Sequence, residues 1–334
     1  MTEEFFDPLE PPLLDDHGRV RGAVCVVDLD SADPSTQLIG NEPIRIGVAA
    51  RALGTRARNL AARLDATVLR SEAADEPWLI GVPDPLEAVD VLCRSADANP
   101  HAALVLAQVL RATGTRAHTA LDIESFAYSM LLGGPEFARW LSSRGPRSEP
   151  SAAQGVPVLV ARTGDCLTVT LNRPDRRNAY GREMRDALVE ALRLALLDDT
   201  VNNVILQGAG PCFSAGGDLT EFGTAPESVT AHFLRTSSGA GRLLYQLERK
   251  LEARLHGSCI GAGIELPAFA GRVTAARGTV FRLPEIGMGL IPGAGGTVSI
   301  TRRIGRWRTM FLALTGQPLD VDTALGWGLI DAIE

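Results

Sequence analysis

Short apolar runs rich in Val, Ile and Leu recur in the first part of the chain and predict β-strands. The segments "RGAVCVVDL" and "PIRIGVA" are of this kind, and two shorter runs follow at 66–70 and 77–82. A stretch with helical spacing, ending near Leu64, separates the second run from the third. This alternation of strand and helix predicts a βαβ-like arrangement.

Between Pro85 and Trp140 the pattern becomes helical. Apolar residues recur there at steps of three and four, as in "HAALVLAQVLRAT", and the pattern breaks at "GGP" (133–135). We therefore interpret residues 21–141 as an N-terminal α/β domain whose role the sequence does not give, with its helices as a candidate assembly surface. A disordered lead-in is expected over residues 1–20.

A stretch dominated by Pro, Gly, Ser and Ala, "SSRGPRSEPSAAQGVP" (142–157), has no hydrophobic periodicity. This composition favours an interdomain linker over an ordered surface loop. The pattern then restarts with a hairpin of two strands around Gly164, an amphipathic helix over 181–199 and a buried strand over 201–210. A second and larger domain is predicted over 158–334.

Composition and charge exclude several classes of protein. The net charge of -7 argues against general nucleic-acid binding, which needs a basic face. The five cysteines are scattered, with no CxxC or Cys/His spacing, so the sequence predicts neither a zinc site nor a disulfide framework. No run approaches the ~18 apolar residues of a membrane span, and the acidic N-terminus is unlike a signal peptide. These features predict a cytoplasmic protein without a membrane span, a metal or a nucleic-acid partner.

A first glycine-rich turn lies in "AGPCFSAGGDLTEF" (209–222), where a strand ends. Ala215-Gly216-Gly217 lets a ligand approach the main chain, and the N–H of Gly217 is well placed for a developing negative charge. "DLTEF" is expected to open a helix, with Asp218 and Glu221 forming a capping box. Asp218 is accordingly interpreted as structural.

A second glycine-rich turn, "GSCIGAGIEL" (257–266), leads into an apparent helix. The N–H of Ala262 would be one of the unpaired donors of its first turn. Two such turns, around Gly217 and Ala262, could direct two N–H groups at one oxygen, as an oxyanion hole requires.

Glu265 and Glu285 stand among residues that suit a core. A carboxylate in an apolar pocket has a raised pKa, and a pair of them can divide the work of moving protons. From spacing alone this is a weak signal, because most acidic residues are solvated surface groups. The nearby "IGMGLIPGAGGT" is not closed by Gly-Lys-Ser/Thr and is therefore not a P-loop, and no GxGxxG motif follows a strand.

Taken together, these segments resemble the enoyl-CoA hydratase/isomerase (crotonase) superfamily over about 158–334. The resemblance implies an α/β protein with a crotonase-like ββα spiral core, joined here to the smaller N-terminal α/β domain. The segments that carry it, in the family's order and spacing, are "LNRPDRRNAYGREM", "GAGPCFSAGGDLTEF", "HGSCIGAGIEL", "FRLPEIGMGLIPGAGGT" and "ALTGQPLDVDTALGWGLID".

The resemblance implies action on a 2-enoyl-CoA thioester. Hydration is favoured, and double-bond isomerisation or a non-catalytic acyl-CoA-binding subunit are the alternatives. The N–H groups of Gly217 and Ala262 would form the oxyanion hole, Glu265 would activate water and Glu285 would protonate the α-carbon. Further substrate-binding positions implied in the same way are Ala215, Gly216, Gly261, Pro292 and Gly293, together with Arg176 and Arg177 near the CoA phosphates. For these two arginines a solvated loop is the alternative.

The same resemblance implies no metal or redox cofactor, coenzyme A only as part of the substrate, and a homo-oligomer, either a trimer or a dimer of trimers. Relatives continue with C-terminal helices that cover the pocket. This chain stops at Glu334 without them, so the N-terminal residues are expected to take over the covering role. Relatives also carry a small apolar strand where this chain has "KLEARLHG", so Glu252 and Arg254 are expected to pair.

Overall fold

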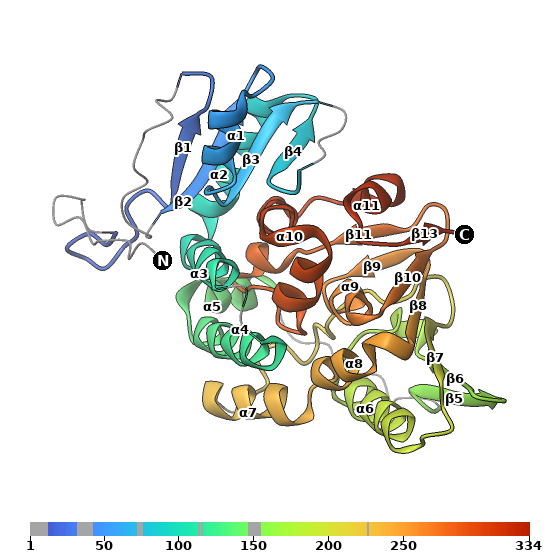
Figure 1. Ribbon diagram of the computed structural model, residues 1–334. Helices are drawn as coiled ribbons and strands as arrows, with labels where there is room; N and C mark the ends of the chain where they lie inside the picture. The colour runs from blue at the N-terminus through green and yellow to red at the C-terminus, as the bar shows by residue number, and fades with distance from the viewer. Residues whose placement is uncertain are drawn as a thin grey trace.

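The structure is a computed structural model, and the elements lie in two parts that pack on each other (Figure 1). The residues it describes are 13–31, 43–71, 76–112, 114, 116–145, 155–225 and 227–334.

The N-terminal part contains a parallel sheet whose strands follow chain order, which confirms the βαβ-like prediction. Its core-facing residues are β-branched or aliphatic, and Ile44, Ile46 and Val68 are buried. The elements are β1 (Val24–Asp28), β2 (Ile44–Ala49), α1 (Thr55–Ala61), β3 (Ala66–Arg70) and β4 (Leu79–Val82).

Four helices follow the sheet, and prolines open three of them because the first-turn N–H groups have no intrahelical partner. The helical pattern is interrupted at residues 133–134, as predicted. The helices are α2 (Pro85–Ala98), α3 (Pro100–Arg111), α4 (Ala117–Leu132) and α5 (Pro135–Ser143).

The C-terminal part is built on a sheet of order β13-β10-β8-β7-β6-β5, in which only the β5–β6 hairpin is antiparallel. A smaller sheet has the order β12-β11-β9. The strands are β5 (Val158–Thr163), β6 (Cys166–Leu171), β7 (Asn203–Gly208), β8 (Leu251–Leu255), β9 (Ser258–Ile260), β10 (Arg272–Ala275), β11 (Val280–Arg282), β12 (Leu319–Asp320) and β13 (Ala332–Ile333). On β8, Arg254 and Glu252 form the expected ion pair at 2.8 Å.

Helices and 3-10 turns cover the faces of these sheets. The long helix α10 bends at Gly305, whose backbone (φ 79°, ψ 161°) is not helical. The helices are α6 (Arg182–Leu197), α7 (Ser228–Ser238), α8 (Gly241–Leu247), α9 (Ala262–Glu265), α10 (Gly296–Thr315) and α11 (Val321–Trp327). The 3-10 turns are η1 (Pro174–Arg176), η2 (Glu248–Lys250), η3 (Pro267–Phe269) and η4 (Glu285–Met288).

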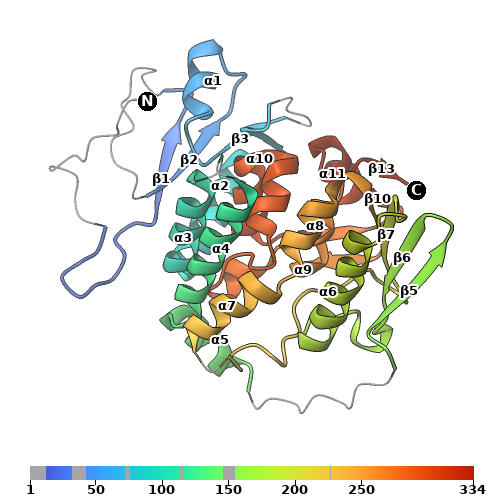
Figure 2. The same cartoon turned by 60° about the horizontal axis from the view of Figure 1, so that its bottom comes forward.

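One buried apolar cluster runs through both parts of the molecule. It includes Leu106 of α3, Val169 of β6 and Ile300 of α10, and Figure 2 shows α3, α4 and α10 side by side. The N-terminal helices therefore complete the core of the C-terminal part. None of the helices in the described part of the chain is long and apolar enough to cross a membrane.

The described residues include only part of the segments in which domain boundaries were predicted. Most of the proposed linker, residues 146–154, lies outside the described residues, as do residues 1–12 of the proposed lead-in. Residues 13–20 form a turn in which Asp15 accepts hydrogen bonds from the N–H groups of His17 and Arg19. The division into domains stays a prediction.

The helix expected at "DLTEF" is wrong, because residues 219–223 form turns instead. The Asp218 carboxylate accepts from the N–H and the hydroxyl of Thr220 and pairs with Arg176 at 2.8 Å. Glu221 does not reach back to Asp218. Its carboxylate accepts from the N–H of Arg182, at 2.9 and 3.0 Å, and so caps the start of α6.

Candidate active site

The two glycine-rich turns lie directly against each other. Ser214 pairs with Cys259, and the Ser214 carbonyl accepts from the N–H of Ile260 at 3.1 Å. Gly216 has a positive φ of 92°, and a Cβ there would stand 2.5 Å from the Ile260 carbonyl oxygen. Glycine at position 216 is therefore what lets the two turns approach so closely.

Asn178 holds the first turn in place. Its side-chain amide donates to the carbonyls of Ala209, Cys212 and Phe213 at 2.9 to 3.1 Å, and the side chain is fully buried. The sequence reasoning did not single out Asn178. It lies in the quoted segment "RRNAYG", where an Asn between arginines and a glycine-rich stretch was the available signal.

Gly217 and Ala262 both line one cavity. Neither N–H donates a hydrogen bond within the described residues, since the pairing of Gly217 with Tyr180 uses the amides of Tyr180 and Asp218. Ala262 is the first residue of α9, where the N–H has no intrahelical partner. Two unpaired donors beside one cavity make an arrangement that can bind a developing oxyanion.

Gly261 forms the sharp turn between β9 and α9. Its backbone (φ 50°, ψ -121°) is one that L side chains rarely adopt. A Cβ at this position would also collide with the carboxylate of Glu285, and it would lie 3.8 Å from Oε1 of Glu265. Both glutamates therefore converge on Gly261, although they are twenty residues apart in the sequence.

Glu265 closes α9 and is only 2% exposed. Its Oε2 accepts hydrogen bonds from the N–H groups of Ala294 and Gly296, at 2.7 and 3.0 Å. Burial, the charge of Glu285 and the charge of Glu124 raise the pKa of Glu265, and the two N–H donors act in the opposite direction.

Glu285 opens η4 and has a different environment. Its Oε2 is buried and has no hydrogen-bond partner among the described residues. Burial raises the pKa of Glu285 to about 8, with the charge of Glu124 adding to the effect. The pKa values of both carboxyls are raised, and Glu285 differs from Glu265 in that no N–H group of the described part of the chain donates to its second oxygen.

A third buried carboxylate, Glu124 of α4, comes from the N-terminal part and was not predicted. Its Oε1 accepts from the N–H of Gly295, and its Oε2 accepts from the N–H and the hydroxyl of Thr297, at 2.6 to 2.9 Å. Burial raises its pKa to about 7, against these hydrogen bonds. Glu124 sits mid-helix without a motif, and the only signal was a charged residue in the apolar stretch "ALDIESFAYSMLL".

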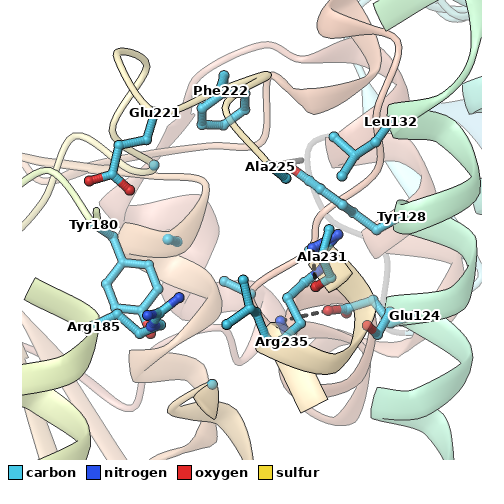
Figure 3. A pocket seen from close by; sticks show the side chains of 18 of the residues that line it. Glu124, Tyr128, Leu132, Tyr180, Arg185, Glu221, Phe222, Ala225, Ala231 and Arg235 are labelled. Carbon is cyan, nitrogen blue, oxygen red and sulfur yellow. Dashed lines mark hydrogen bonds between the residues drawn. The ribbon is translucent and has the colours of Figure 1, made fainter. Parts of the chain in front are cut away.

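The cavity has a volume of about 560 Å³, within the usual range for small-molecule sites. Figure 3 shows Glu124, Tyr128 and Leu132 of α4 on one side of it and Tyr180 and Arg185 on the other. From α5, Phe137 and Leu141 also line it. The N-terminal helices thus form one wall of the cavity, as expected for a segment that covers the pocket.

Arg235 of α7 lies between these walls (Figure 3). Its guanidinium stacks 4.2 Å from the centre of the Tyr128 ring and donates to the Ser129 hydroxyl and the Ala231 carbonyl. Stacking of this kind is a favourable cation–π contact. Tyr128 in turn packs on Gly293, where a Cβ would collide with its ring.

The cavity brings together five predicted site residues, namely Gly217, Ala262, Glu265, Glu285 and Gly293. Its lining does not include the other six, namely Ala215, Gly216, Gly261, Pro292, Arg176 and Arg177.

These six residues have other surroundings. Gly216 and Gly261 shape the turns behind the lining, and Pro292 is buried. The N–H of Ala215 donates to the carbonyl of Arg177, whose side chain is exposed, whereas Arg176 is engaged by Asp218. Substrate-binding roles for these residues stay predictions. Among the residues that the structure describes, no group of three or more His, Cys, Asp or Glu side chains is arranged to hold a metal ion.

The fold and the cavity define a protein of the crotonase type, and comparison with known proteins agrees. Residues 162–334, more than half of the chain, match the family described as enoyl-CoA hydratase/isomerase. The chain therefore belongs to this family, and the predicted fold class is confirmed.

Two relatives from Escherichia coli K12 illustrate the similarity. The chain is 37% identical to a 1,2-epoxyphenylacetyl-CoA isomerase, over 49% of this chain and 64% of the relative. It is 32% identical to a 2,3-dehydroadipyl-CoA hydratase, over 53% of this chain and 68% of the relative. The match thus spans about two thirds of the length of each relative.

A solved structure, an enoyl-CoA hydratase/carnithine racemase from Magnetospirillum magneticum, is 29% identical with a TM-score of 0.50. The match covers 54% of this chain and 68% of that one. The N-terminal part, including α4 and Glu124, precedes the region that matches the family.

Proposed function

We propose that the protein adds water across the double bond of a 2-enoyl-CoA thioester. One observation carries this proposal: two buried carboxylates converge beside Gly261 in a cavity that is also lined by Gly217 and Ala262, whose N–H groups donate no hydrogen bond within the described residues. The family membership supports an enzyme of the crotonase type, and the hydratase reaction is the finer step that we propose.

The thioester oxygen would accept hydrogen bonds from the N–H groups of Gly217 and Ala262. These donors polarise the conjugated system and stabilise the enolate that forms when water attacks the β-carbon. Each such donor is typically worth ~3 kcal/mol in a transition state. Both amides belong to turns that are locked against each other, so little reorganisation is needed as charge develops.

The different environments of the two glutamates support a division of roles. Burial raises the pKa of Glu265, but two N–H donors stabilise its ionised form, so we assign Glu265 as the base that takes a proton from the attacking water. Glu285, with its pKa raised to about 8, holds a proton at neutral pH and delivers it to the α-carbon. One proton leaves water for Glu265 and one leaves Glu285 for carbon. The pair therefore still holds one proton, now on Glu265, and this proton must return to Glu285 by exchange with solvent before the next turnover.

This chemistry needs neither a metal nor a redox cofactor, because the amides polarise the thioester and the carboxylates move the protons. Coenzyme A enters only as part of the substrate, and Arg177 and Arg176 remain candidates for its phosphates. We also propose a cytoplasmic location and a homo-oligomer, a trimer or a dimer of trimers. Light scattering of the purified protein measures the assembly.

Double-bond isomerisation is the second candidate, because the family that the chain matches is described as enoyl-CoA hydratase/isomerase. Isomerisation moves a proton between two carbons and needs one carboxylate to act as both base and acid. The presence of two convergent carboxylates favours hydration. An acyl-CoA-binding subunit without turnover is the remaining alternative.

The test is a spectrophotometric assay of the unaltered chain with crotonyl-CoA and longer 2- and 3-enoyl-CoA thioesters, beside Glu265→Gln and Glu285→Gln. Hydration predicts that each variant loses most of kcat, by ~10²- to 10⁴-fold, while acyl-CoA binding persists. Survival of double-bond migration in one variant would favour the isomerase. Binding without turnover in the unaltered chain would refute an enzymatic role.

A further inference from the structure

Glu124, the buried carboxylate of α4, has no role in the chemistry proposed above. We propose that Glu124, on a helix that precedes the family-matched region, is a positioning residue for the catalytic base Glu265. The inference rests on the proposed function and extends it to the N-terminal part of the chain.

Four consecutive backbone amides, at residues 294–297, span the start of α10. The first and third, of Ala294 and Gly296, donate to Glu265. The second and fourth, of Gly295 and Thr297, donate to Glu124. The two carboxylates thus alternate along one short segment, which we call the shared amide segment.

The backbone geometry of this segment requires both acceptors. Gly295 has a φ of 106°, and a Cβ there would stand 2.6 Å from the ring of Phe269, so the turn is tight and buried. Buried N–H groups are costly to leave unpaired. If Glu124 stopped accepting, the Gly295 and Thr297 amides would seek other partners, and the amides that orient Glu265 would move with them.

The hydrogen bonds of Glu124 suit a positioning role better than a direct role in the reaction. Both of its oxygens are occupied, and three donors reach them. Its position is also fixed along the whole side chain, because the residue is only 2% exposed. The three hydrogen bonds that Glu124 accepts within the described residues all come from Gly295 and Thr297, so the carboxylate fixes the segment that orients the base.

Glu124 also acts on the base through its charge. The charged and titratable groups facing it are Arg235 of α7, Tyr128 of its own helix, Glu265 of α9 and Glu285 of η4. Its negative charge raises the pKa of Glu265, whereas Arg235 favours the ionised form of Glu124. Removing the charge should lower the pKa of Glu265, so the base would stay ionised to lower pH.

The chain offers a matched control in Glu136 of α5. It is a buried carboxylate of the N-terminal part, 3% exposed, and it accepts from the N–H groups of His101 and Ala102 at the start of α3. Glu136 does not line the cavity. The substitutions Glu124→Gln and Glu136→Gln therefore remove the same charge and similar hydrogen bonds, but only the first touches the shared amide segment.

The experiment compares kcat, KM and the pH profile of kcat for enoyl-CoA hydration in the full chain and in the two variants. We expect Glu124→Gln to lower kcat by ~10- to 100-fold, the loss typical of a catalytic group displaced by up to 1 Å, with KM near that of the unaltered chain. We also expect the acid limb of its pH profile to move to lower pH. Glu136→Gln should lose thermal stability alone. Equal kcat values and equal pH profiles in the two variants would overturn the inference.

A second measurement decides the case if the unaltered chain shows no turnover, which would refute the proposed function. Urea unfolding of Glu124→Gln, Glu265→Gln and the double variant tests whether the two carboxylates act on one segment. A double variant that loses clearly less stability than the sum of the single losses supports the shared segment. Additive losses, like those expected for Glu136→Gln combined with Glu265→Gln, would refute it.

Discussion

Gly296 gives a direct test of the catalytic base, because a Cβ at this position would press on the Glu265 side chain and, beside it, on the Cβ of Pro292. Gly296 is the first residue of α10 and has no positive φ, so alanine meets no backbone strain. Its Cβ would stand 2.6 Å from Cγ and 2.8 Å from Oε2 of Glu265. Ordinary contact begins near 3.4 Å, so the Glu265 side chain must give way by roughly 0.8 Å, close to the ~1 Å displacement that can cost 10²-fold in rate.

We therefore expect Gly296→Ala to lower the kcat of enoyl-CoA hydration by ~10- to 100-fold. Overpacking of this kind costs about 1–3 kcal/mol of stability, and the better helix propensity of alanine, worth up to ~1 kcal/mol, offsets part of it. Steady-state kinetics and urea unfolding measure the two effects separately.

The control is Gly326→Ala in α11, another helical glycine without a positive φ, where a Cβ meets no atom within 4 Å. This variant should gain up to ~1 kcal/mol of stability from helix propensity and keep its kcat. In a background of Glu265→Gln, Gly296→Ala should add almost no further loss, because the base is already absent. Turnover of Gly296→Ala equal to that of Gly326→Ala would refute the reasoning.

Three further predictions concern stability. The pKa of Glu285 is raised to about 8 in the fold, so the folded state loses stability as pH rises from about 4.5 to about 8. The Tm of Glu285→Gln relative to the unaltered chain should therefore increase from pH 5 to pH 8, and a constant difference in Tm would contradict this. Asp65→Asn removes the buried anion that pairs with the partly buried Arg111 guanidinium and should cost up to about 3 kcal/mol in urea unfolding with kcat unchanged. Gly293→Ala displaces the Tyr128 ring and should lower stability by about 1–3 kcal/mol; an unchanged urea midpoint would show that the ring has room to move.

Local periodicity was sufficient to predict many of the elements. The apolar runs of β2 and β7 and the amphipathic pattern of α6 depend on near neighbours, and the structure has these elements within a few residues of the predicted ranges. The helix expected at Asp218 failed because its carboxylate found other partners. Thr220 and Arg176 satisfy it, and a turn replaces the capping box.

The residues of the candidate site also differ in how far the sequence alone could predict them. The glycine-rich turns could be predicted from short segments, whereas the two glutamates were a weak signal until the family resemblance gave them roles. The structure brings Gly217, Ala262, Glu265 and Glu285 to one cavity. Glu124 could not be predicted, since its partner Gly295 is 171 residues away in the chain. No local pattern encodes a contact of that range.

The packing of α3 and α4 against α10 also has a consequence for the folding of the nascent chain. Translation produces the two early helices well before α10, whose last residue is Thr315. Helices α2, α7 and α8 can cover other faces of α3 and α4 earlier, but the faces that pack on α10 stay exposed until α10 has left the ribosome, and such exposed apolar surface favours aggregation. Nascent chains stalled before Gly296 should therefore depend on chaperones, and those released after Thr315 should not.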